Sequence, residues 1–288
     1  MRRTLAVYSK RPTLCAPAQL SSASLIIDVG SSDSFNRAHV PGAVRSPLRG
    51  DIKDPHHPSG VLPASAMGAL FDALGVPAGE SVGATVVYDT GEMLAACRLA
   101  WLLSFYGLPN VRVLNGGFAG YLAAGGAARS SFSAPPPPPS PALEPTLPRA
   151  PAPQRALLVG AAEVLAACRA QPGAAVSQII DARTPAEFSG ADARGLPRTG
   201  HVPCALNVPF QALLQRGAFL PPGELKAALL ARGWDPERPT IVMCLAGVRA
   251  AVAAMGVVAA GGNNVAVYEG SAQEWAADAS LPLRKDAD

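Results

Sequence analysis

The residues with the clearest capacity for chemistry lie in the stretch TIVMCLAGVRAAVAAMG, which begins at Thr240. The β-branched run TIVM predicts a buried strand that ends at Cys244. Five residues after the cysteine, Arg249 opens an alanine-rich pattern that predicts a helix over residues 249–260. A thiol between a strand and a helix is either a small buried hydrophobe or a nucleophile placed for catalysis.

The loop between Cys244 and Arg249 favours the nucleophile. A helix that begins here makes the backbone N–H groups curl around the sulfur, and Gly247 permits the unusual backbone angles that this requires. This cradle and the helix dipole would stabilise a thiolate and bind an anionic substrate. We therefore expect Cys244 to be catalytic, and Arg249 either to add positive charge at the rim or to pair with an acid. The peptide groups expected to bind substrate are those of Leu245, Ala246, Gly247 and Val248.

The elements that position this loop occur twice along the chain. A proline-rich segment, SAPPPPPSPALEPTLPRAPAP, separates the two copies and predicts an extended spacer. We expect a first domain over residues 1–130, a linker over residues 131–155 and a second domain over residues 156–288. The matching positions of the two copies are Asp28 and Asp181, His39 and His201, Asp89 and Cys244, and Gly117 and Gly270.

Each copy alternates short, continuously apolar strands with helical patterns. Such strands are typical of a parallel sheet that is buried on both faces, so the predicted fold class is α/β, with two doubly wound domains, each a central parallel sheet flanked by helices. Ligands of this architecture sit at the loops that follow the carboxyl ends of the strands. Asp89 and Cys244 each occupy such a loop.

Composition excludes several classes of function. The formal net charge of +3 comes without a lysine-arginine block, so we expect no nucleic-acid partner. The longest apolar runs fall short of the ~20 residues that cross a bilayer, so we expect no membrane partner. Five cysteines without a C-x-x-C pair argue against a disulfide framework or a structural zinc site. We expect a soluble protein in a reducing compartment, cytoplasmic or mitochondrial.

Several motifs together resemble the rhodanese superfamily. CLAGVRA resembles its active-site loop, C-x-x-G-x-[RT]-[SA], and IIDARTPAEF resembles the signature of its first strand. GHVPCALNVPF and the earlier AHVPGA are similar to its G-H-I-P-G-A segment, and VYEGSAQEWAA is similar to the closing segment of its tandem-domain members. The chain therefore resembles the two-domain sulfurtransferases of this superfamily over nearly all of its length outside the spacer.

The resemblance implies a thiosulfate or 3-mercaptopyruvate sulfurtransferase whose first domain is catalytically empty, because Asp89 replaces the cysteine. The thiolate of Cys244 would attack the outer sulfur of a small anionic donor and become a persulfide. Cyanide, a small thiol or a protein thiol would then accept that sulfur. The resemblance implies no metal and no organic cofactor, and we expect a monomer.

Some positions depart from the family pattern. Leu245 and Ala246 match neither the mercaptopyruvate nor the thiosulfate enzymes, so the loop does not name its donor. Arg194 lies seven residues before His201 and carries over as a substrate-binding arginine. Glu187 stands where the family has its other such arginine, and we interpret it as a structural helix residue rather than a charge that faces the donor.

The first domain offers further candidates in VRSPLRGDIKDPHHPSGVLP. Asp51 is a candidate for a cleft acid, but Gly60 stands where the mercaptopyruvate enzymes have a histidine, and His56 and His57 lie nearby.

Structural roles are expected for several conspicuous residues. We expect His201 to fix a loop and Arg183 to pair with Asp181. Cys204 replaces a glycine of the family segment and has no functional interpretation from the sequence. Three further cysteines are expected on helical faces in the core, namely Cys15, Cys97 and Cys168.

Two other functions compete with sulfur transfer by an enzyme. Related phosphatases also place a cysteine and an arginine at a helix start, but five residues separate them, whereas four separate Cys244 from Arg249. A smaller ring suits sulfur rather than phosphate. The second alternative is a non-enzymatic module or a persulfide carrier that acts through a protein partner.

Overall fold

The computed structural model describes residues 11–47, 61, 63–76, 83–131, 154–169 and 177–285. Most of the predicted linker, residues 132–153, lies outside this set. The first-domain candidates Asp51, His56 and His57 also lie outside this set. So does Gly60, which replaces the family's histidine.

The first domain is a five-stranded sheet in the order β1-β5-β4-β2-β3, with every neighbouring pair parallel. Its strands are β1 (Thr13–Cys15), β2 (Ala23–Asp28), β3 (Val44–Arg45), β4 (Ala84–Tyr88) and β5 (Val111–Leu114). Its helices are η1 (Pro17–Ser22), α1 (Ser32–Arg37), α2 (Ala64–Ala73), α3 (Leu94–Phe105) and α4 (Gly117–Ala123).

The second domain repeats this topology, with the sheet order β6-β12-β11-β7-β8 and parallel neighbours. Its main strands are β6 (Leu158–Val159), β7 (Gln178–Asp181), β8 (Ala205–Asn207), β11 (Thr240–Met243) and β12 (Val265–Tyr268). Its helices are η2 (Arg155–Leu157), α5 (Ala161–Arg169), α6 (Pro185–Ser189), η3 (Phe210–Leu213), α7 (Pro222–Leu230), α8 (Val248–Ala259) and α9 (Ser271–Ala277). The small antiparallel pair β9 (Leu214–Gln215) and β10 (Ala218–Phe219) lies apart from the main sheet.

The central strands are apolar because helices cover both faces of each sheet. In β11 all four residues are buried, and β4 is buried from its second residue onward. This burial explains why the strands read as continuous apolar runs rather than alternating ones. The predicted α/β fold with two doubly wound domains is therefore confirmed, while the exact domain boundaries stay a prediction.

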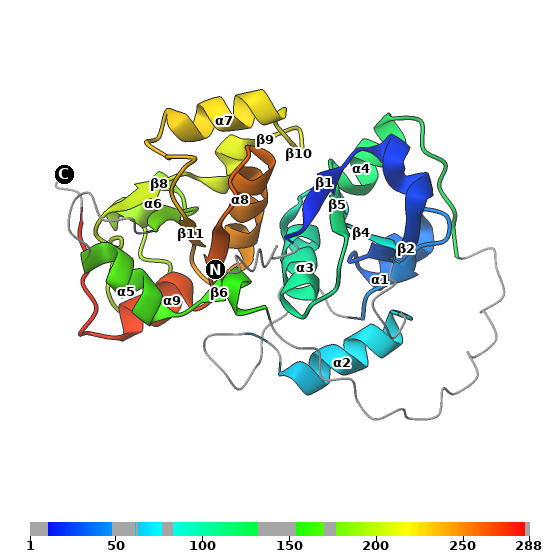
Figure 1. Cartoon of the computed structure of the whole chain (residues 1–288). Helices are drawn as coiled ribbons and strands as arrows, with labels where there is room; N and C mark the ends of the chain where they lie inside the picture. The colour runs from blue at the N-terminus through cyan, green and yellow to red at the C-terminus, as the bar shows by residue number, and fades with distance from the viewer. Residues whose placement is uncertain are drawn as a thin grey trace, which may run out of the picture.

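The two domains pack through equivalent helices. Helices α3 and α8 lie side by side between the two lobes, and one hydrophobic cluster continues through both domains (Figure 1). Hydrogen bonds cross the same interface, since the Trp101 indole N–H donates to the Leu157 carbonyl at 2.9 Å and the Phe219 amide donates to Asn115 Oδ1 at 2.8 Å. The helix that follows Cys244 is thus held on one side by the first domain.

Two of the three structural cysteines differ from expectation. Cys97 is fully buried in α3, as predicted, but Cys15 lies in the edge strand β1 rather than on a helix. Cys168 lies on α5 and is half-buried instead of in the core. The strand at Cys15 was missed because three residues are too short for a periodic pattern.

None of the helices in the described residues is long and apolar enough to span a lipid bilayer.

Candidate active site

Cys244 lies directly after β11, at the carboxyl edge of the sheet where the loop turns into α8. Its side chain is 1% exposed, and the Gly247 amide donates a hydrogen bond to its Sγ at 3.2 Å. Gly247 is the residue before α8 and has φ +84°, a left-handed conformation that favours glycine. One amide of the predicted cradle therefore points at the sulfur, and the helix begins immediately behind it.

The first domain shows what this type of loop binds. Asp89 occupies the position of Cys244, and its buried carboxylate accepts three backbone N–H groups. Gly91 and Met93 donate to Oδ1 at 2.9 and 3.1 Å, and Ala96 donates to Oδ2 at 3.2 Å. The loop is therefore an anion cradle that the protein fills with its own carboxylate. In the second domain a sulfur takes the place of that carboxylate.

Ser271, the first residue of α9, supports the cysteine and was missed by the sequence analysis. Its buried hydroxyl accepts a hydrogen bond from the Cys244 amide at 3.2 Å and donates to the Tyr268 carbonyl at 2.7 Å. It lies just after β12, next to β11 in the sheet. The signal was available, because adjacent parallel strands end at the same edge.

Arg249 pairs with an acid, which decides between the two predicted roles. Its Nη1 and Nη2 donate to Oε2 and Oε1 of Glu187 at 2.7 and 2.8 Å. The Arg249 side chain is 19% exposed and the Glu187 side chain 3% exposed. This geometry is bidentate, the arrangement in which arginine binds a carboxylate most specifically. The hydrogen bonds that Arg249 donates to Glu187 raise the pKa of the guanidinium above its ordinary value.

Glu187 also caps its own helix, as its predicted structural role requires. The Thr184 amide and hydroxyl donate to Glu187 Oε2 at 3.1 and 3.0 Å, and the Glu187 amide donates to Thr184 Oγ1 at 3.3 Å. These bonds form a capping box at the start of α6. Burial alone would raise the pKa of Glu187, but the hydrogen bonds from Arg249 and Thr184 outweigh it and lower the pKa to about 2. The carboxylate is therefore charged and compensated.

Arg194 reaches the same carboxylate from the solvent side. Its Nε lies 3.7 Å from Glu187 Oε1, and its side chain is 54% exposed. Its backbone has φ +46°, in the left-handed region that non-glycine residues rarely adopt. Two arginines thus face one glutamate close to the cysteine loop, which leaves one uncompensated positive charge in this group of three.

Arg183 and His201 have the structural roles expected of them. The buried Arg183 guanidinium pairs with Asp181, with an Nη2 to Oδ2 distance of 2.6 Å. The His201 ring stacks on Phe188 with centroids 3.8 Å apart, and its Nδ1 lies 3.0 Å from the Phe188 carbonyl oxygen. His39 of the first domain stacks on Phe35 in the same way.

A buried ion pair joins the first domain to the cysteine loop. Arg98 of α3 donates through Nη1 to Glu269 Oε2 at 2.6 Å and through Nη2 to Oε1, and both side chains are buried. Glu269 lies beneath the loop, since a Cβ added at Gly247 would lie 3.1 Å from both its backbone oxygen and its Oε2. Gly247 is therefore required by close packing as well as by its backbone angle.

A family model for the rhodanese-like domain matches this chain twice, over residues 16–124 and residues 161–278. The chain belongs to the rhodanese family. Its two domains correspond to the two matches, and the cysteine loop lies in the second. The predicted family and its tandem form are confirmed.

Relatives of this rhodanese include named enzymes. The 3-mercaptopyruvate sulfurtransferase of Escherichia coli is 31% identical over 265 residues, which cover 89% of this chain and 86% of the relative. The thiosulfate sulfurtransferase of Corynebacterium glutamicum is 32% identical over 277 residues, which cover 92% of this chain and 87% of the relative. The crystal structure of SseA from Escherichia coli matches with a TM-score of 0.70 at 28% identity, covering 90% of this chain and 98% of SseA. The predicted sulfurtransferase class is confirmed.

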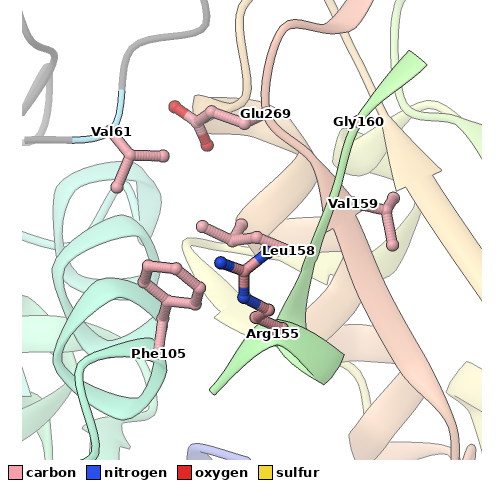
Figure 2. A pocket seen from close by; sticks show the side chains of 7 residues that line it. All are labelled: Val61, Phe105, Arg155, Leu158, Val159, Gly160 and Glu269. Atoms are coloured by element: carbon pink, nitrogen blue, oxygen red, sulfur yellow. The ribbon is translucent and has the colours of Figure 1, made fainter. Parts of the chain in front are cut away.

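A cavity of about 320 Å³ opens at the interface between the two rhodanese domains (Figure 2). Val61 and Phe105 of the first domain face Leu158 of the second across it, whereas the side chain of Val159 points to the other side of β6. The lining is completed by Gly160 and by two charged side chains, Arg155 and Glu269. Glu269 also packs beneath Gly247, but no residue of the loop from Cys244 to Arg249 lines the cavity.

Proposed function

We propose that this chain moves a sulfane sulfur from a small anionic donor through a persulfide on Cys244, and that the preferred donor is a monoanionic organic thiol such as 3-mercaptopyruvate. The observation that carries the proposal is the contact between Gly247 N and Cys244 Sγ, in a loop whose sister binds a carboxylate. A thiolate or a persulfide anion is the ligand that such a cradle stabilises.

The charges beside the cysteine support a monoanion over a dianion. Arg249 is already paired with Glu187, so its positive charge is neutralised within the protein. Arg194 is the exposed partner of that pair and supplies the remaining single positive charge. A carboxylate of a monoanionic donor balances one charge, whereas thiosulfate brings two.

The reaction has two displacement steps at sulfur. The Cys244 thiolate attacks the donor sulfur, the carbon–sulfur bond of 3-mercaptopyruvate breaks, and the electron pair leaves as the enolate of pyruvate, which then takes a proton. An acceptor such as cyanide or a thiolate attacks the outer sulfur of the persulfide and regenerates the Cys244 thiolate. The Gly247 amide and the start of α8 stabilise the negative sulfur in both steps.

The proposal also covers the sulfur acceptor, the oligomeric state and the cellular compartment of the protein. Because Cys244 is 1% exposed, a small acceptor reaches the persulfide more readily than a protein thiol does. We propose a soluble monomer in a reducing compartment that needs neither nucleic acid nor membrane. The substrate-binding residues proposed are Leu245, Ala246, Gly247 and Val248 through their peptide groups, together with Arg194. Arg249, which the sequence also predicted to bind substrate, is assigned to the pair with Glu187 instead.

Steady-state kinetics test the donor preference. Cyanide is the common acceptor, and kcat/KM is measured for 3-mercaptopyruvate and for thiosulfate. The proposal expects the larger value for 3-mercaptopyruvate. A larger value for thiosulfate would overturn the preference but keep the sulfurtransferase, and no turnover of either donor would overturn both.

A further inference from the structure

Cys204 occupies a turn position whose backbone conformation favours glycine. The turn is closed by a hydrogen bond of 3.1 Å from the Ala205 amide to the Val202 carbonyl, and Cys204 within it has φ +68°. The matching turn of the first domain carries Gly42, with φ +80°. A turn of this kind needs a positive φ at its third residue, which glycine adopts without strain. The second domain thus places a thiol where the fold prefers no side chain.

A second thiol lies against this turn. Cys168 of α5 donates through its Sγ to the Pro203 carbonyl oxygen at 3.0 Å. That carbonyl belongs to the peptide bond that joins Pro203 to Cys204, so the Cys168 sulfur lies within about 6 Å of the Cys204 Cα. The Cys204 thiol is also among the groups that raise the pKa of Cys168, as a close neighbour does. This proximity makes the two cysteines candidates for a disulfide.

The two thiols differ from the other three cysteines in exposure. Cys15, Cys97 and Cys244 are buried, whereas Cys204 is exposed and Cys168 is half-buried. Burial, and then the neighbouring Cys204 thiol, raise the pKa of Cys168 to about 12. Cys204 is therefore the sulfur that meets a reagent from solvent, and Cys168 is the protonated thiol behind it.

We propose that Cys168 and Cys204 form a redox-active dithiol, which a small-molecule disulfide such as glutathione disulfide oxidises to an intramolecular disulfide. The Cys204 thiolate attacks one sulfur of the small disulfide, and a new S–S bond forms as the first small thiolate leaves. The Cys168 sulfur then attacks the Cys204 sulfur, the second small thiolate leaves and takes the proton of Cys168. One small disulfide is reduced to two thiols for each protein disulfide formed.

The disulfide would tie α5 to the turn that precedes β8. It would close the chain between residues 168 and 204, and a loop of this length constrains the unfolded state strongly. We therefore expect oxidation to raise the Tm by roughly 5 °C. Neither thiol lies in the cysteine loop of the active site, so this dithiol is separate from the site of sulfur transfer.

The test uses the full chain with the Cys244→Ser substitution, which removes the catalytic thiol from the reaction. The protein is equilibrated with mixtures of reduced and oxidised glutathione, and remaining thiols are alkylated before peptide mass mapping. We expect a Cys168–Cys204 cross-linked peptide with the mass loss of two hydrogens, together with the rise in Tm.

Two variants in the same background serve as controls. Cys204→Gly relieves the backbone strain, and Cys168→Ala keeps the turn, so both are expected to fold and to show no shift in Tm on oxidation. The proposal is overturned if Cys204 stops at the mixed disulfide with glutathione, if the cross-link involves another cysteine, or if the Cys204→Gly variant gains the same Tm shift.

Discussion

Arg249 donates two parallel hydrogen bonds, of 2.7 and 2.8 Å, to the Glu187 carboxylate beside the cysteine loop. This pair joins the first turn of α8 to the first turn of α6. It converts a buried carboxylate, which would repel an anionic donor, into part of the frame that holds the active-site loop.

Arg249→Met should destabilise the protein because it leaves the Glu187 carboxylate buried without its main partner. We expect a loss of about 2–3 kcal/mol in the free energy of unfolding, measured by chemical denaturation. The double variant Glu187→Gln/Arg249→Met should recover at least half of that loss, since no charge then stays unpaired. Equal stability of Arg249→Met and wild type would show that the pair does not hold the loop.

The free energy of unfolding should decrease in acid because Glu187 becomes protonated and loses its ion pair. Its folded pKa of about 2 lies below its unfolded value, so it stabilises the fold above the unfolded pKa and loses this contribution as the pH falls toward the folded pKa. Between about pH 5 and about pH 3 we expect the free energy of unfolding of wild type to fall by roughly 1 kcal/mol more than that of Glu187→Gln. This figure allows for the screening of the exposed side of the ion pair by solvent. Parallel acid profiles of the two proteins would contradict this assignment.

Arg98→Met should weaken the interface between the domains. It leaves Glu269 buried and unpaired beneath Gly247, and we expect a loss of about 3–5 kcal/mol in unfolding free energy. Arg232→Met, at an exposed arginine of α7's carboxyl end, is the matched control and should stay within about 0.5 kcal/mol of wild type. The double variant Arg98→Met/Glu269→Gln should recover much of the loss. If Arg98→Met behaved like the control, the ion pair would be dispensable.

Asp89→Ala should reduce stability without reducing sulfur transfer per folded molecule. Three backbone N–H groups lose the carboxylate that they share, at a cost of about 2 kcal/mol. Asp89→Asn keeps the oxygen that accepts two of them and should lose less. Thermal melts measure the stability and donor turnover measures the activity. A loss of turnover at unchanged stability would assign the first loop a catalytic role instead.

Much of the fold could be predicted because its strands are buried on both faces. The runs LIID, VVY, IID and IVM have no polar alternation, and their repeated order along the chain indicates two copies of one domain. The edge strands β1 and β6 could not be predicted in this way. They are two or three residues long and acquire their conformation only by pairing with β5 and β12.

The candidate site, too, could be predicted only where it depends on local sequence. Cys244 and its loop follow from local spacing, because a strand end and a helix start place them. The partner of Arg249 does not, since Glu187 lies 62 residues away and meets it only when α6 and α8 pack together. The Arg98–Glu269 pair spans the two domains and has no local signal in the sequence.

The most direct test of the account is the mass of the protein after one turnover with 3-mercaptopyruvate and no acceptor. We predict that wild type gains the mass of one sulfur atom, that peptide mapping places it on Cys244, and that cyanide removes it as thiocyanate. Cys244→Ser should gain no sulfur in the cysteine-loop peptide. A wild-type protein that takes sulfur from neither 3-mercaptopyruvate nor thiosulfate, or a Cys244→Ser variant that turns over as wild type does, would contradict the persulfide on Cys244.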